Sequence, residues 1–185
     1  IFSRSAFILR KEVLDFEKKI TKLLNIKYCV ALNSGTDALL MSLSQIKINK
    51  GDEIIVPSHT YVASVGSIKH IGAEPVFVDI RDDFNLDPNE IKKKITKKTR
   101  AIMVVHLNGR CCEMDKIMKI AKKYKLHVIE DCAQAFGSKF NNRYAGSFGL
   151  AGAFSLHPMK NLNIPGDGGF LVTNNKKVYS NVLLL

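Results

Sequence analysis

Lys160 is the residue whose position best suits covalent chemistry. It follows the short apolar run Ala151–Phe154, which predicts a buried strand, and it sits in a loop rich in Pro, Asn and Gly. Partial burial favours the neutral form of an amine, and a neutral amine can attack an aldehyde to form a Schiff base. Lysine is abundant in this chain, so the stretch taken alone favours an ordinary solvated lysine at 160.

A second group of residues suits the binding of an anion. Ser34, Gly35 and Thr36 open a predicted helix directly after the apolar strand 28–32. Free backbone N–H groups and the helix dipole attract anions at such a position. The Thr36 hydroxyl adds a donor, and Gly35 allows close approach. Ordinary N-capping by Ser34 or Thr36 explains the pattern equally well.

Asp131 ends another apolar strand, 127–131, so its carboxylate is expected to be partly buried and to need a cationic partner. The pyridine nitrogen of pyridoxal phosphate is such a partner, and an acid that keeps it protonated makes the ring an electron sink. Gln134 could face the same ligand, and Tyr61 offers a flat face for stacking. The alternatives are that Asp131 caps the following turn and that Tyr61 belongs to the core.

Together these residues supply a phosphate cradle, a stacking ring, an acid for a ring nitrogen and a lysine for an aldehyde. That combination is far more specific than any of its parts, because motif matches taken singly are weak hypotheses. It predicts a pyridoxal 5'-phosphate site.

The elements that must position this site alternate along the chain. Apolar runs predict strands at 28–32, 53–57, 75–79, 101–105, 127–131, 151–155 and 170–173. Periodic or capped segments predict helices at 7–25, 38–46, 61–71, from 87 onward, at 114–124 and after 173. The strands are continuously apolar, which is typical of burial on both faces. We therefore expect one domain (1–185) of the α/β class, with a mostly parallel sheet covered by helices.

Ligands of such sheets collect at the carboxyl ends of the strands, which is where the polar motifs fall.

The chain has 185 residues and a net charge of +11, much of it in Lys92–Lys94, Lys97, Lys98 and Arg100. This charge suits an anionic small substrate. A basic nucleic-acid-binding domain is the less favoured alternative, because no aromatic platforms are interleaved with the basic residues.

The remaining composition excludes other classes. No run is apolar and long enough for a membrane helix. The four cysteines, Cys29, Cys111, Cys112 and Cys132, fit no zinc spacing and form a poor disulfide framework. Small buried thiols in a reducing cytoplasm, with no metal, are expected.

Five motifs, taken in order, resemble one known family. They are Asn33-Ser-Gly-Thr-Asp-Ala38, Gly51-Asp-Glu-Ile-Ile-Val-Pro57, Glu130-Asp-Cys-Ala-Gln134, Ala145-Gly-Ser147, and Lys160-Asn-Leu with Gly166-Asp-Gly-Gly169. The chain resembles the DegT/DnrJ/EryC1/StrS aminotransferases from about Phe7 to its end. These are fold-type I enzymes that use pyridoxal phosphate to aminate keto sugars attached to nucleotides.

The resemblance assigns roles to seven residues. It implies that Lys160 bonds to the cofactor aldehyde and acts as the catalytic base and acid. It also implies that Asp131 pairs with the pyridine nitrogen, that Gln134 contacts the ring or its hydroxyl, and that Tyr61 stacks on the ring. The phosphate would be held by Gly35, Thr36 and Ser155. Dehydratase relatives carry His where this chain has Lys160, so the lysine indicates transamination.

The resemblance also implies what lies around this chain. The chain corresponds to the large domain, incomplete at both ends and without the C-terminal small domain. The expected amino donor is glutamate, the expected acceptor is a nucleotide-linked keto sugar, and the expected assembly is a homodimer that binds neither nucleic acid nor membrane. A non-catalytic or regulatory homologue of the same family is the alternative.

Overall fold

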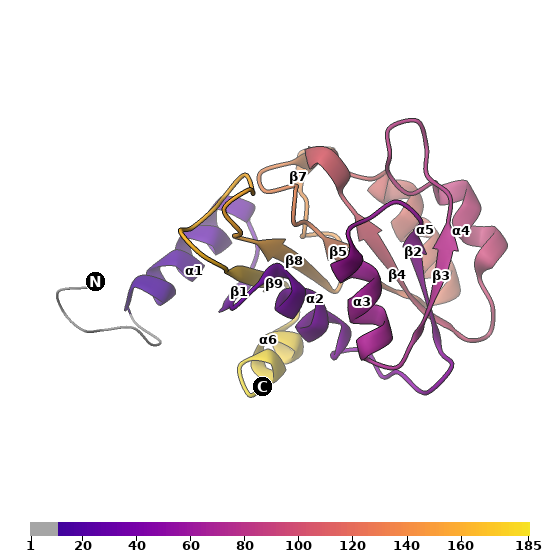
Figure 1. Ribbon diagram of the computed structural model, residues 1–185, viewed down its shortest axis with the longest axis horizontal. Helices are drawn as coiled ribbons and strands as arrows, with labels where there is room; N and C mark the ends of the chain where they lie inside the picture. Colours follow the sequence, from indigo (N-terminus) through magenta and orange to yellow (C-terminus); the bar gives the residue numbers. More distant parts are fainter. Residues whose placement is uncertain (1–10) are drawn as a thin grey trace.

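The computed structural model describes residues 11–185, and its central element is a seven-stranded sheet (Figure 1). The strands in order across it are β1 (Tyr28–Leu32), β9 (Gly169–Thr173), β8 (Ala151–Ser155), β5 (His127–Asp131), β4 (Thr99–Val105), β2 (Glu53–Pro57) and β3 (Glu74–Val78). The β2–β3, β2–β4, β4–β5 and β5–β8 pairs are parallel. Only β9 runs against its neighbours, β1 and β8. The prediction of a mostly parallel α/β sheet is confirmed.

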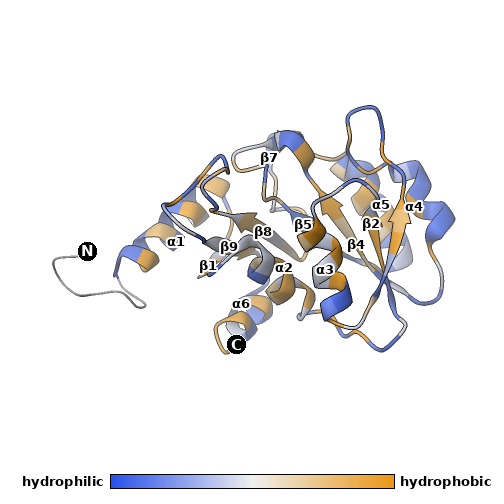
Figure 2. Cartoon of the chain, viewed as in Figure 1, coloured by the Kyte–Doolittle hydropathy of each residue, from blue (hydrophilic) through white to orange (hydrophobic). Residues whose placement is uncertain are grey.

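Helices cover both faces of the sheet. On one face lie α2 (Gly35–Leu43), α3 (Val62–His70) and α6 (Lys176–Val182). On the other lie α1 (Lys11–Leu24), α4 (Pro88–Lys94) and α5 (Met114–Tyr124). Alternate residues of one strand enter opposite layers: Ile54 and Val56 pack under α2 and α3, whereas Ile55 packs toward α4 and α5. Figure 2 shows β2, β3 and β4 coloured as apolar and α4 as largely hydrophilic.

Local sequence explains where the helices begin and end. The Ser34 side chain caps α2 by accepting from the Asp37 N–H, and Asp87 caps α4 with Pro88 at the first turn. Asn175 caps α6 by accepting from the N–H groups of Lys177 and Val178. Helix α5 ends at Lys125, which adopts the left-handed conformation common at helix C-termini.

Several boundaries differ from the predicted ones. Helix α2 starts at Gly35 rather than at 38, because Ser34 is its cap. Strand β4 starts at Thr99, before its apolar run begins. The first helix was predicted to start at residue 7, and residues 7–10 lie outside the described part. The small hairpin of β6 (Lys139–Phe140) and β7 (Arg143–Tyr144) was not predicted.

No helix within residues 11–185 combines the length and apolar character needed to cross a bilayer.

Candidate functional site

All seven predicted site residues line one cavity of about 520 Å³ at the carboxyl ends of the central strands. They are Gly35, Thr36, Tyr61, Asp131, Gln134, Ser155 and Lys160. They come from the N-termini of α2 and α3, from the ends of β5 and β8, and from the loop before β9. A cavity of this size suits a small-molecule ligand. The fold therefore brings together residues that are up to 125 positions apart in the sequence, from Gly35 to Lys160.

The N-terminus of α2 forms one end of the cavity. Ser34 Oγ accepts from the Asp37 N–H at 3.0 Å, so the capping alternative holds for this residue. The N–H groups of Gly35 and Thr36 have no earlier carbonyl of the helix to bond to, and both residues line the cavity. A Cβ on Gly35 would lie 2.7 Å from the Ser155 Cβ. Glycine thus lets α2 approach β8, which places the Ser155 side chain beside these free donors.

Asp131 forms the buried acid of the site, with 5% of its surface exposed. Its Oδ2 accepts from Ser64 Oγ at 2.7 Å, and its Oδ1 accepts from the Ala133 N–H at 3.1 Å. Burial raises the pKa of Asp131 above its ordinary value, and the two hydrogen bonds partly oppose that rise. Within residues 11–185 no ion pair reaches this carboxylate. A cationic ring nitrogen in the cavity would supply the missing partner.

Gln134 is oriented by a turn that the sequence did not predict. Its Oε1 accepts from the Asn108 N–H at 2.7 Å, which leaves the amide nitrogen as a donor toward the cavity. Asn108 belongs to the short 3-10 turn Leu107–Gly109 and has a φ of 54°. Asparagine is one of the few residues that adopt this left-handed conformation readily. The prediction placed Gln134 at the site but missed the residue that orients it.

The loop that carries Lys160 is held by its own hydrogen bonds. Ser155 Oγ accepts from the His157 N–H at 3.3 Å, and the His157 carbonyl accepts from the Lys160 N–H at 2.8 Å. His157 Nδ1 accepts from the Met159 N–H at 3.2 Å. Lys160 itself is half-buried and lines the cavity. It is therefore neither a fully solvated lysine nor a core residue.

Tyr61 lies at the mouth of the cavity, directly before α3. Its surface is 71% exposed, so the alternative that it belongs to the core is wrong. An exposed ring beside a cavity is available for stacking on a planar ligand. Taken together, the free helix donors, the unpaired buried acid, the amide, the lysine and the ring fit pyridoxal phosphate.

A buried cluster behind the site involves groups that could bind a metal, namely His106, Glu130 and Cys132. Their hydrogen bonds explain them without one. His106 Nδ1 accepts from the Cys112 N–H at 3.1 Å, which leaves the ring hydrogen on Nε2 to donate to Glu130 Oε2 at 3.0 Å. Burial raises the pKa of Cys132 to about 12, so its thiol stays protonated. Protein donors thus already engage His106 Nδ1 and Glu130 Oε2.

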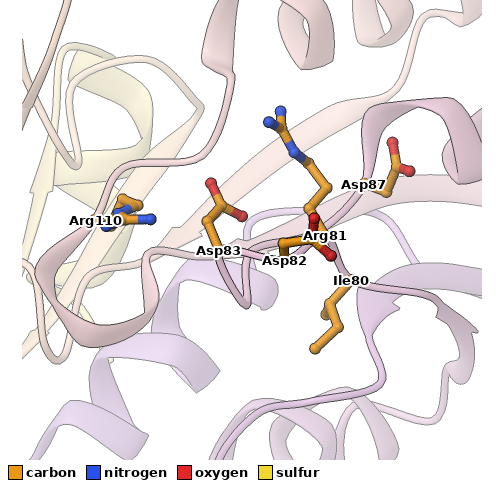
Figure 3. Close-up of a pocket in the computed structure, with 6 residues that line it drawn as sticks. All are labelled: Ile80, Arg81, Asp82, Asp83, Asp87 and Arg110. Carbon is orange, nitrogen blue, oxygen red and sulfur yellow. The ribbon is translucent and has the colours of Figure 1, made fainter.

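A second hollow, of about 480 Å³, lies beside the loop after β3 and contains none of the predicted site residues (Figure 3). Its lining mixes charges of both signs: Arg81, Asp82, Asp83, Asp87 and Arg110, with Ile80. Three of these side chains already serve the fold, since Arg81 pairs with Glu113, Asp83 accepts from the Asn85 N–H and Asp87 caps α4. Figure 3 shows the others spread along the rim rather than converging on one point.

Comparison with protein-family models gives a single description for nearly the whole chain. The model of the DegT/DnrJ/EryC1/StrS aminotransferase family matches residues 2–185.

Individual relatives agree with that match. A dTDP-3-amino-3,6-dideoxy-alpha-D-galactopyranose transaminase of Aneurinibacillus thermoaerophilus is 48% identical over 174 residues, which are 93% of this chain and 48% of the relative. A GDP-perosamine synthase of Escherichia coli O157:H7 is 44% identical over 169 residues, covering 91% and 46%. The solved structure of NtdA from Bacillus subtilis with bound cofactor PMP superposes with a TM-score of 0.91 at 33% identity, covering 98% and 41%. The chain thus spans about half the length of the curated relatives it matches.

Proposed function

The chain belongs to the DegT/DnrJ/EryC1/StrS aminotransferase family, and from that premise we propose that it forms the cofactor-binding domain of a pyridoxal 5'-phosphate-dependent enzyme that aminates a nucleotide-linked keto sugar. The observation that carries the proposal is the cavity in which Lys160, Asp131 and the free N-terminus of α2 meet. The related transaminase and GDP-perosamine synthase, named for amino sugars, support the substrate class. The NtdA structure with PMP supports the cofactor.

Each residue of the cavity has a task in this proposal. The N–H groups of Gly35 and Thr36, with the Ser155 hydroxyl, hold the cofactor phosphate at the positive end of α2. Asp131 holds a proton on the ring nitrogen, Gln134 donates from its amide, and Tyr61 covers one ring face. When bound, the cofactor supplies an aldehyde and an electron-withdrawing ring. Lys160 would be the amine that holds the aldehyde, and its free amine would act as the base and acid that moves a proton.

The partners follow from the same proposal. Glutamate is the expected amino donor and a nucleotide-linked keto sugar the acceptor, in the cytoplasm. A homodimer is expected, and exposed apolar side chains at the mouth of the cavity and beside it support it. Tyr61, Val62 and Met159 are 71%, 70% and 84% exposed, which is unusual for large apolar residues. A second copy of the chain would cover them.

The test is covalent trapping. The protein is mixed with pyridoxal 5'-phosphate, its absorbance is recorded, and borohydride is added to fix any cofactor bonded to an amine. Mass spectrometry should find one fixed cofactor per chain, on Lys160, in the parent and in the control Lys176→Ala. In Lys160→Ala the fixed cofactor should fall to background. Equal labelling of the parent and Lys160→Ala would overturn the assignment of Lys160.

The alternative, a non-catalytic or regulatory homologue, makes a different prediction. A pocket that has lost its chemistry would take up no cofactor through Lys160, in this chain or in a longer chain that spans the full length of the relatives. A longer chain that traps cofactor and releases 2-oxoglutarate from glutamate would exclude that alternative.

A further inference from the structure

Ser64 contacts the buried acid of the site and was not among the predicted site residues. It lies in α3, is fully buried, and places its Oγ 2.7 Å from Asp131 Oδ2. It does not line the cavity, whereas its neighbours Thr60 and Ala63 do. Any effect of Ser64 on a bound ligand must therefore pass through Asp131.

The hydrogen bonds around Ser64 have a fixed direction when Asp131 is ionised. A carboxylate only accepts, so the Ser64 hydroxyl donates to Oδ2. Ser64 then has no second hydrogen for Thr60 Oγ1, which lies 2.8 Å from Ser64 Oγ, and Thr60 must donate to Ser64. The chain runs from Thr60 to Ser64 to Asp131. Reversing it would require a proton on Asp131.

This arrangement opposes the effect of burial on Asp131. Burial disfavours the charged carboxylate, and the first hydrogen bond that favours it comes from Ser64, the second from the Ala133 N–H. Hydrogen bonds to a charged acceptor in a buried site are stronger than neutral ones, and a chain of donors polarises each member. Without the Ser64 hydroxyl, Oδ2 would keep no protein donor among the described residues.

We propose that Ser64, supported by Thr60, is a positioning residue that keeps Asp131 ionised and oriented to pair with the ring nitrogen of the cofactor. This inference rests on the proposed function, because an ionised Asp131 is needed only if the cavity binds a cofactor with a protonated ring nitrogen. An unionised Asp131 would carry its own proton and would not stabilise a protonated ring nitrogen. Ser64 would therefore tune the electron-withdrawing strength of the ring without touching it.

The chain offers a matched control one helical turn further along α3. Ser67 is 2% exposed, and its Oγ has no hydrogen-bond partner in the described part of the chain. Ser67→Ala removes the same atom from the same helix at the same depth but leaves Asp131 untouched. The other titratable groups around Asp131, namely Lys160, His106, Glu130 and Cys132, are unchanged in both variants.

The test follows the Asp131 carboxyl group in the protein without cofactor, by carbon NMR of aspartate-labelled samples, with Asp131→Asn to assign the signal. Ser64→Ala should bind the Asp131 proton about tenfold more tightly than the parent. Thr60→Val, which keeps the side-chain shape, should change proton binding in the same direction by less. Ser64→Thr, which keeps the hydroxyl, and Ser67→Ala should match the parent.

Cofactor trapping on the same samples separates this inference from the proposed function. Trapping on Lys160 in the parent, with Asp131 titrating alike in Ser64→Ala and the parent, would overturn the role of Ser64 alone. An equal change in Ser64→Ala and Ser67→Ala would also overturn it, because the cause would be a disturbance of α3. Failure of both the parent and a chain of the relatives' full length to take up cofactor would overturn the proposed function and, with it, the role assigned to Ser64.

Discussion

At the scale of one residue, the buried carboxylate of Asp131 lowers the stability of the protein. Its pKa in the folded protein is raised by burial above the ordinary 3.8, so the folded state binds this proton more tightly than the unfolded state does. The stability that this proton contributes is fully present below about pH 3.8 and is lost as the pH rises through the folded pKa. At neutral pH the buried charge therefore lowers the free energy of unfolding of the protein without cofactor.

We accordingly expect Asp131→Asn to raise the free energy of unfolding at pH 7.5. The asparagine can accept from the Ala133 N–H and donate to Ser64 Oγ, so the hydrogen bonds are kept and only the buried charge is lost. The advantage should shrink toward pH 3.8, because the parent acid, whose pKa lies above that value, takes up its proton as the pH falls. Urea unfolding at both pH values measures the difference. A variant that is less stable than the parent at pH 7.5 would show that the buried charge of Asp131 does not lower the free energy of unfolding.

At the scale of the element, the N-terminus of α2 depends on a glycine. A Cβ on Gly35 would lie 2.7 Å from the Ser155 Cβ, whereas a Cβ on Gly66 of α3 would meet nothing within 4 Å. Gly35→Ala should push α2 away from β8, lower the free energy of unfolding by about 1–3 kcal/mol and weaken cofactor binding. Gly66→Ala should stabilise the protein by about 0.5–1 kcal/mol, because alanine is the better helix former.

Two measurements on both glycine variants check these predictions. Unfolding in urea gives the change in stability, and titration with pyridoxal 5'-phosphate gives the change in cofactor binding. If Gly35→Ala bound the cofactor as tightly as the parent, the close contact between α2 and β8 would not matter for the phosphate site.

Glu130 holds the turn before β8, again at the scale of the element. One of its oxygens accepts from the N–H groups of Phe148 and Gly149, at 2.7 and 2.6 Å. The other accepts from the Gly146 N–H at 2.7 Å and pairs with His106. Because Glu130 is fully buried, Glu130→Ala should destabilise the protein by roughly 3–5 kcal/mol.

The control for Glu130 is Glu113, which makes ion pairs at the surface with Arg81 and Lys116. Glu113→Ala should cost no more than about 1 kcal/mol. Hydrogen exchange locates the effect, because the amides of residues 146, 148 and 149 should lose protection in Glu130→Ala and keep it in Glu113→Ala. Unchanged protection of these amides would mean that the turn does not depend on Glu130.

Local patterns in the sequence predicted the strands. They also predicted the cavity residues that lie at the ends of those strands. Apolar runs located the central strands, and small residues after β1 located the N-terminus of α2. The sequence could not show that β9 is antiparallel, because strand direction depends on the connection after β8 and not on composition. Nor could it select Ser64 over Ser67, since both are small polar residues on the buried side of α3 and only packing decides which one reaches Asp131.

At the scale of the whole molecule, the two ends of the sheet carry different sites: the predicted cofactor cavity lies at one end and a basic hollow at the other. The strands β2, β3 and β4 are parallel (Figure 1). The cavity lies at the carboxyl ends of the central strands. The amino ends carry a hollow of about 410 Å³ whose lining includes four basic residues, Lys47, Lys97, Arg100 and Lys125. The net charge of +11 is thus concentrated in part away from the site. Polyanions and the cofactor should bind independently.

We therefore expect a fluorescent single-stranded DNA to bind only weakly, with a dissociation constant above about 1 µM at physiological salt and with steep salt dependence. Lys97→Glu with Lys125→Glu should weaken this binding and reduce its salt dependence, because contacts that release counterions are lost. The control, Lys18→Glu with Lys22→Glu on α1, changes the net charge equally and should have a smaller effect. Trapping of cofactor on Lys160 should be the same in all of them. Tight, salt-insensitive DNA binding would favour a nucleic-acid-binding protein, whereas displacement of the DNA by pyridoxal 5'-phosphate would show that the two ends of the sheet are not independent.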